Sequence, residues 1–154
     1  MARIIDGNKI SEEIRVELKQ EVEALVAGGV TPGLAVVLVG ENAASKVYVG
    51  RKKKACAELR IASFSHELPA DTPEDVLLGL IRDLNADSRV HGILVQLPLP
   101  KHISEPKVLN LIDPRKDVDG FHPLNTGKML NGEETLLPCT PHGCQQLLVR
   151  SGCE

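Results

Sequence analysis

Aromatic residues are scarce in this 154-residue sequence, which contains no tryptophan, one tyrosine and two phenylalanines. Proteins that bind single-stranded nucleic acids use aromatic side chains as stacking platforms and carry a positively charged groove. Here the net charge is −3, and the one basic run, residues 51–54, is short. We therefore expect no nucleic-acid partner.

Long hydrophobic runs are also missing. The longest apolar run, residues 34–39, is far too short to cross a bilayer. The first ten residues, "MARIIDGNKI", lack the apolar segment of a signal peptide. We therefore expect a cytoplasmic protein with no membrane partner.

Cysteine is present at four positions, and in an intracellular chain we expect free thiols. Cys139, His142 and Cys144 match no common zinc spacing, and no second cluster completes four ligands. We therefore expect no metal site. The sequence here instead favours a helix that Thr140 caps, with Pro141 in its first position.

Hydrophobic periodicity predicts alternating helices and strands. Helices are expected at residues 8–27, 43–59, 72–85 and 104–112, and strands at 33–40, 61–68 and 92–96. The expected inward stripes are Ile10, Ile14, Leu18, Val22 and Leu25 in the first helix, and Val76, Leu77, Leu80, Ile81 and Leu84 in the third. Residues 113–138 are turn-rich, with a weak helix at "PLNTGKML". This order predicts an α/β fold, a three-layer α-β-α domain with a mainly parallel sheet.

The last expected strand ends in an amide, Gln96, after which Pro98 and Pro100 stop the strand. A buried amide without partners costs roughly 1–3 kcal/mol, so either the fold or a ligand must satisfy Gln96. Ligands of open parallel sheets bind at the carboxyl ends of the strands. The position of Gln96 therefore favours a ligand.

The helix expected at 43–59 places a lysine on its core-like face. Lys52 falls near the middle of that face, whereas Arg51 and Lys54 point away from it and Lys53 lies on its flank. Tyr48 precedes Lys52 by one turn, so the two side chains are neighbours. They form either a ligand wall with an acid/base group, or a snorkelling lysine beside a packing tyrosine.

Two acidic residues, Asp117 and Asp119, flank a valine before a glycine turn. The further oxygen ligands and the later glutamate of a calcium loop are missing. The pair is either a charged turn or a source of one carboxylate that holds the donor edge of a heterocycle.

Four segments, taken together and in this order, resemble the bifunctional methylenetetrahydrofolate dehydrogenase/methenyltetrahydrofolate cyclohydrolase family. They are "ASKVYVGRKKKAC", "HGILVQLPLP", "KDVDGFHPLNTGKM" and "PCTPHG", and they run through nearly the whole chain. The resemblance implies oxidation of 5,10-methylenetetrahydrofolate to 5,10-methenyltetrahydrofolate with NADP, followed by hydrolysis to 10-formyltetrahydrofolate. The hydrolysis needs a group that loses and regains a proton, which a permanently charged arginine cannot do.

The resemblance also implies a substrate site, made of Tyr48, Lys52, Val95, Gln96, Leu97 and Asp119. In this site Lys52 would be the catalytic lysine, and Gln96 would hydrogen-bond near it and the reacting carbon. Tyr48 would stack on the folate and complete the catalytic set, and Asp119 would hold the pterin edge. Tetrahydrofolate derivatives are thus the expected partners.

Members of the family are nearly twice as long as this chain, and the sequence contains no G-x-G-x-x-G fingerprint. We expect residues 1–138 to form the folate-binding catalytic domain and 139–154 to begin the linker helix toward a Rossmann-type NADP domain absent from this chain. The full-length protein is expected to be a homodimer, and this chain alone to be inactive or impaired. The alternative is a truncated, non-catalytic folate-binding or interaction module.

Overall fold

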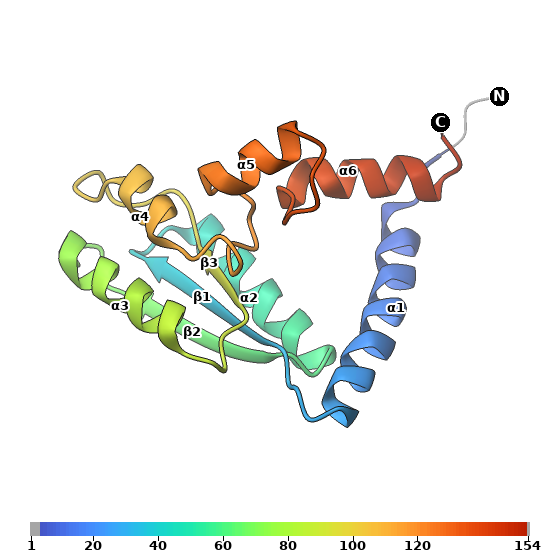
Figure 1. Ribbon diagram of the computed structural model, residues 1–154, viewed down its shortest axis with the longest axis horizontal. Helices are drawn as coiled ribbons and strands as arrows, with labels where there is room; N and C mark the ends of the chain where they lie inside the picture. The colour runs from blue at the N-terminus through green and yellow to red at the C-terminus, as the bar shows by residue number, and fades with distance from the viewer. Residues whose placement is uncertain (1–3, 154) are drawn as a thin grey trace.

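Three parallel strands form the centre of the computed structural model, which describes residues 4–153 (Figure 1). The strands are β1 (Gly33–Val39), β2 (Ala62–Leu68) and β3 (Gly92–Val95), in the order β2-β1-β3. The helices are α1 (Gly7–Ala27), α2 (Ala43–Glu58), α3 (Glu74–Ala86), α4 (Glu105–Leu111), α5 (Pro123–Leu130) and α6 (Cys139–Arg150). The predicted α/β fold with a parallel sheet is confirmed.

The core lies on both faces of β1, the central strand. On one face Val37 packs in a cluster with Leu77 and Ile81 of α3, and all three are fully buried. On the other face Val36 packs with Val49 of α2. Burying each such side chain stabilises the fold by about 1.5–3 kcal/mol. In Figure 1, α3 and α4 cover one face of the sheet and α2 covers the other.

Helix α1 stands apart from the sheet and meets α6 at one end (Figure 1). Arg150 of α6 donates two hydrogen bonds of 2.7 Å to the Glu17 carboxylate of α1. Because the sheet formed by β1, β2 and β3 does not cover α1, Leu18 and Leu25 of the predicted stripe remain 40% and 48% exposed. Val76 of α3 was also expected to face inward and is 51% exposed. The buried face of α3 is formed by Leu77, Ile81 and Leu84, and Val76 lies to one side of it.

Helix α6 begins at Cys139 rather than after Thr140. Pro138 holds the N-cap position, and no side chain caps the helix. The predicted cap at Thr140 is therefore wrong, because Thr140 lies inside the first turn. Pro141 is tolerated there because the first four N–H groups of a helix have no helical acceptor.

No helix between residues 4 and 153 combines the length and the hydropathy that crossing a membrane requires. Within the same range, no three His, Cys, Asp or Glu side chains lie together as a metal site would need. All four cysteines are free, with Cys56 buried and the other three exposed.

Candidate functional site

The sequence places polar residues at the carboxyl ends of β1 and β3. Helix α2 starts just after β1, where the Asn42 side chain accepts a hydrogen bond from the Ser45 backbone N–H at 3.0 Å. Gln96 follows β3, and its backbone N–H donates to the Val37 carbonyl of β1 at 2.8 Å. The first turns of α2 and the end of β3 therefore lie at the same edge of the sheet, where open parallel sheets bind ligands.

Lys52 and Gln96 meet at this edge. The Lys52 ammonium donates to the Gln96 Oε1 at 3.1 Å, and the Gln96 Nε2 donates to the Leu97 carbonyl at 2.9 Å. Both side chains are half-buried. One N–H of the amide, one of its lone pairs and two ammonium hydrogens are left over for other partners. The fold thus satisfies part of Gln96 and leaves hydrogen-bonding capacity for a ligand.

The neighbouring basic residues are engaged elsewhere. Lys53 pairs with Glu67 of β2 at 2.6 Å, and Lys54, whose side chain is 80% exposed, lies 3.8 Å from Glu58. Lys52 is therefore the member of the basic run that contacts Gln96 at the end of β3, as its helical face predicts. Tyr48 lies one turn before it and is 56% exposed, so its ring is available for stacking.

The two acidic residues of the glycine turn differ in their surroundings. Asp117 is 1% exposed, and its Oδ2 accepts hydrogen bonds from the His122 backbone N–H at 2.8 Å and from the Asn125 Nδ2 at 3.0 Å. Asp119 is half-buried. Burial raises the pKa of its carboxyl, while the nearby positive charge of Lys52 lowers that pKa in part. Asp117 is thus a structural acid, and Asp119 belongs with Lys52.

Two glycines allow the backbone around Asp119 to pack closely. The Lys116 carbonyl accepts a hydrogen bond from the Ile93 N–H at 2.7 Å, which adds this segment to the edge of β3. A Cβ at Gly92 would lie 2.6 Å from the Val118 side chain. Gly120 has a φ of +66°, and a Cβ there would lie 2.7–2.9 Å from the backbone of residues 136–138. Asp119 is therefore placed by close backbone contacts on both sides.

Cys139 is a further member of the site, which the sequence did not reveal. Its thiol donates to the Val118 carbonyl at 3.3 Å and lies against the Asp119 carboxylate. Partial burial of the sulfur, in a residue that is exposed as a whole, and the negative charge of Asp119 raise the pKa of the thiol. The sequence signal for Cys139 was its membership in the "PCTPHG" segment. Periodicity could not predict its contact with Val118, because the two residues lie in loop and helix-start segments 21 positions apart.

The two apolar residues of the predicted site, Val95 and Leu97, pack against the hydrophobic core next to Gln96. Val95 is 2% exposed and belongs to the core, so its side chain is not available to a ligand. Leu97 is half-buried against the same core, and its carbonyl fixes the Gln96 amide. Both residues hold Gln96 in place.

A groove of about 740 Å³ lies nearby, between α1 and α6. Its apolar lining includes Ile10, Ile14 and Leu147, and it reaches the site only at Cys139. Lys52, Gln96 and Asp119 do not line this groove, so the candidate site is a separate surface at the edge of the sheet.

The comparison with family models matches residues 5–119 to "Tetrahydrofolate dehydrogenase/cyclohydrolase, catalytic domain". Among curated proteins, the bifunctional protein FolD of Magnetococcus marinus is 57% identical over 155 residues, which cover 100% of this chain and 54% of that protein. The chain thus spans about half the length of the relatives that it matches.

Solved structures give the same result. The bifunctional FolD enzyme from Campylobacter jejuni has a TM-score of 0.95 and 46% identity, covering 97% of this chain and 54% of that one. The methylenetetrahydrofolate dehydrogenase-cyclohydrolase of Trypanosoma brucei, solved with NADP and an inhibitor, has a TM-score of 0.94 and 37% identity. It covers 99% of this chain, which again matches about half (53%) of the solved chain.

Proposed function

The chain belongs to the tetrahydrofolate dehydrogenase/cyclohydrolase family and carries its catalytic domain, and on that premise we propose that it binds a tetrahydrofolate derivative at the Lys52–Gln96 edge of the sheet. The single observation that carries this proposal is the 3.1 Å hydrogen bond between Lys52 and Gln96 at the carboxyl ends of the strands, with Asp119 close by. A proton-carrying amine, an amide and a carboxylate suit a substrate with a reacting carbon and a hydrogen-bonding heterocycle.

The reaction proposed for these residues is the opening of 5,10-methenyltetrahydrofolate by water. The positive charge of the bound methenyl substrate favours loss of a proton from Lys52 to solvent, and the resulting amine takes a proton from the attacking water as the C–O bond forms at the methenyl carbon. The resulting ammonium returns a proton to the ring nitrogen N5 as the C–N5 bond breaks, and the remaining hydroxyl proton leaves to solvent. The product is 10-formyltetrahydrofolate. Gln96 holds the Lys52 nitrogen in place through both proton transfers.

Binding of the substrate falls to the flanking residues. The exposed ring of Tyr48 stacks on the folate, beside Lys52. The Asp119 carboxylate accepts hydrogen bonds from the N–H edge of the pterin. This division leaves Lys52 next to the methenyl carbon and away from the charged tail of the substrate.

Oxidation of 5,10-methylenetetrahydrofolate to the methenyl form is the partner reaction proposed for the whole protein. NADP would accept the hydride, but this sequence contains no glycine-rich phosphate loop that could hold it. We therefore assign residues 1–138 to the folate domain, residues 139–154 to the start of a linker helix, and the NADP site to the half of the relatives that this chain does not span. A homodimer of the whole protein remains part of this proposal.

Calorimetric titration of the 154-residue chain with 5-formyltetrahydrofolate, a stable folate, tests the proposal. We expect saturable binding, and we expect Gln96→Leu to weaken it about tenfold, because the amide N–H and lone pair left over for a ligand are lost and Lys52 loses the partner that holds it. Gln145→Leu, an exposed amide on α6, is the matched control and should bind like the parent. No saturable heat from the parent chain, or equal effects of the two variants, would refute the assigned site.

A further inference from the structure

Asn125 of α5 lies outside the proposed substrate contacts, yet it ties together the two segments that flank Asp119. We propose that Asn125 is a positioning residue that holds Asp119 against Lys52 and Cys139. This inference rests on the proposed function for the importance of Asp119, but the contacts that carry it are independent of any ligand.

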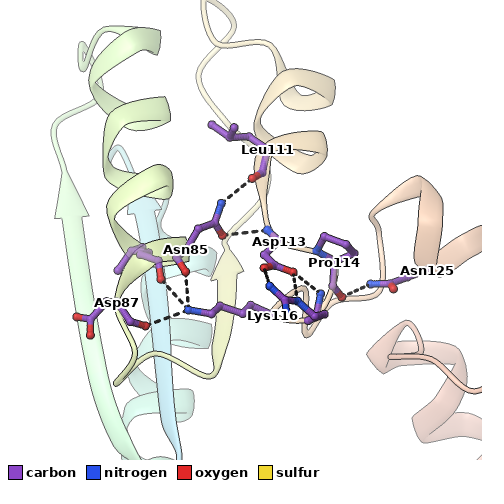
Figure 2. Close-up of polar contacts among 9 residues, drawn as sticks. Asn85, Asp87, Leu111, Asp113, Pro114, Lys116 and Asn125 are labelled. Atoms are coloured by element: carbon purple, nitrogen blue, oxygen red, sulfur yellow. Dashed lines mark hydrogen bonds and ion pairs between the residues drawn. The ribbon is translucent and has the colours of Figure 1, made fainter.

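The side chain of Asn125 makes three hydrogen bonds and is 4% exposed. Its Nδ2 donates to the Pro114 carbonyl at 2.9 Å and to the Asp117 Oδ2 at 3.0 Å. Its Oδ1 accepts from the Thr135 hydroxyl at 2.9 Å. Figure 2 shows the first of these bonds, between Asn125 and Pro114. A buried amide satisfied this fully has one orientation, because turning it would leave polar atoms unpaired.

These bonds reach the chain on both sides of Asp119. Pro114 and Asp117 precede Asp119 in the segment that lies on the edge of β3. Thr135 precedes the stretch 136–138, whose backbone packs against Gly120 and leads directly into Cys139. One amide therefore fixes the distance between the segment that bears Asp119 and the segment that bears Cys139.

A second anchor holds the same loop from the side of α3. The Lys116 ammonium donates to the carbonyls of Leu84, Asn85 and Asp87 at the end of α3, at 3.2, 2.8 and 3.0 Å (Figure 2). The Asn85 side chain adds bonds of 2.8 and 2.9 Å to Leu111 and Asp113. This anchor persists without Asn125. Loss of the Asn125 amide should therefore loosen the part of the loop that bears Asp119 and leave the domain folded.

The rate at which iodoacetamide labels Cys139 reports whether Asp119 stays in place. In a parent chain carrying Cys144→Ser and Cys153→Ser, Cys139 is the exposed thiol and Cys56 is buried. Burial raises the pKa of the Cys139 thiol most and the negative charge of Asp119 raises it further, so removing that charge increases the reactive thiolate. We expect Asp119→Asn to speed labelling at pH 8 about threefold or more.

Asn125→Ala should reproduce most of this acceleration, and it should add little in the Asp119→Asn background, because both changes act on the same carboxylate. Asn85→Ala is the matched control: it removes a half-buried amide from the second anchor and should label like the parent. Thr135→Val, which removes one bond of Asn125, should give a smaller change in the same direction. It replaces Asn125→Ala as the test if that variant does not fold.

Parent-like labelling of Asn125→Ala, acceleration matched by Asn85→Ala, or acceleration that persists in full without the Asp119 charge would each overturn the proposal. Binding of 5-formyltetrahydrofolate gives a separate readout, and we expect Asn125→Ala and Asp119→Asn to weaken it together. If the parent chain binds no folate, the proposed function fails, whereas the labelling rates still decide the role of Asn125.

Discussion

Asp119 destabilises the domain when it is charged. Burial raises the pKa of its carboxyl above the ordinary value, although the charge of Lys52 acts in the opposite direction. The folded protein therefore binds this proton more tightly than the unfolded chain does. The contribution of Asp119 to the free energy of unfolding is thus most favourable below the unfolded pKa of about 3.9 and declines as the pH rises through that value toward the raised folded pKa.

Replacing Asp119 by asparagine should accordingly make the protein more stable at neutral pH and less able to bind folate. We expect Asp119→Asn to raise the Tm at pH 7 by up to about 3 °C. The gain should shrink at pH 3, where the parent carboxyl is protonated too. Titration with 5-formyltetrahydrofolate should show affinity reduced about tenfold or more. A Tm below that of the parent at pH 7 would contradict the view that the charged Asp119 carboxylate destabilises the domain.

The sequence predicts the placement of single residues best where a periodic element presents them. The helical repeat placed Lys52 on the face that meets Gln96, and Gln96 was placed at the end of a buried strand, whereas their role as site residues stays a prediction. Cys139 and Asn125 could not be found in this way. Cys139 meets Val118, and Asn125 meets Pro114 and Thr135, across loops that share no periodic element.

At the scale of elements, the turn at Gly120 is where the segment beside β3 packs against the backbone just before α6. Its backbone has a φ of +66°, and the space for a side chain is filled by the backbone of residues 136–138. Gly132 has a similar φ of +73°, but nothing lies within 4 Å of the position of its Cβ. The two glycines therefore separate the effect of backbone conformation from the effect of close packing.

Alanine at these two glycines should give unequal losses of stability in urea unfolding. Gly132→Ala should lower the free energy of unfolding by about 1–2 kcal/mol, the cost of a left-handed backbone for a residue with a Cβ. Gly120→Ala should lower it by about 3 kcal/mol or more, because overpacking against the backbone adds to that cost. Equal losses would show that the close approach at Gly120 does not contribute.

The sequence predicted the type and order of the elements, since continuous apolar strands alternate with amphipathic helices. It was less informative about their ends and their partners. The start of α6 was missed because no side chain caps it. The exposure of Leu18 was missed because an apolar stripe does not say what covers it, and the sheet of β1, β2 and β3 does not lie against α1.

At the scale of the whole molecule, the domain holds a candidate acid/base site and lacks a dinucleotide fingerprint. Its relatives are about twice as long, so turnover is best measured in a chimera that joins this chain to the second half of the Magnetococcus relative. The central claim is that Lys52, held by Gln96, moves the protons of ring opening.

The direct test of this claim is the rate of hydrolysis of 5,10-methenyltetrahydrofolate, followed by the loss of its absorbance, in the Lys52→Met chimera. Methionine keeps the apolar stem and the helix propensity but removes the nitrogen. We expect the rate to fall by about 10²–10⁴-fold, the usual worth of general acid–base catalysis. Lys53→Met and Lys54→Met, whose side chains pair with Glu67 and Glu58, should keep most of the activity. A Lys52→Met enzyme with a parent-like rate, or equal losses at all three lysines, would contradict the account.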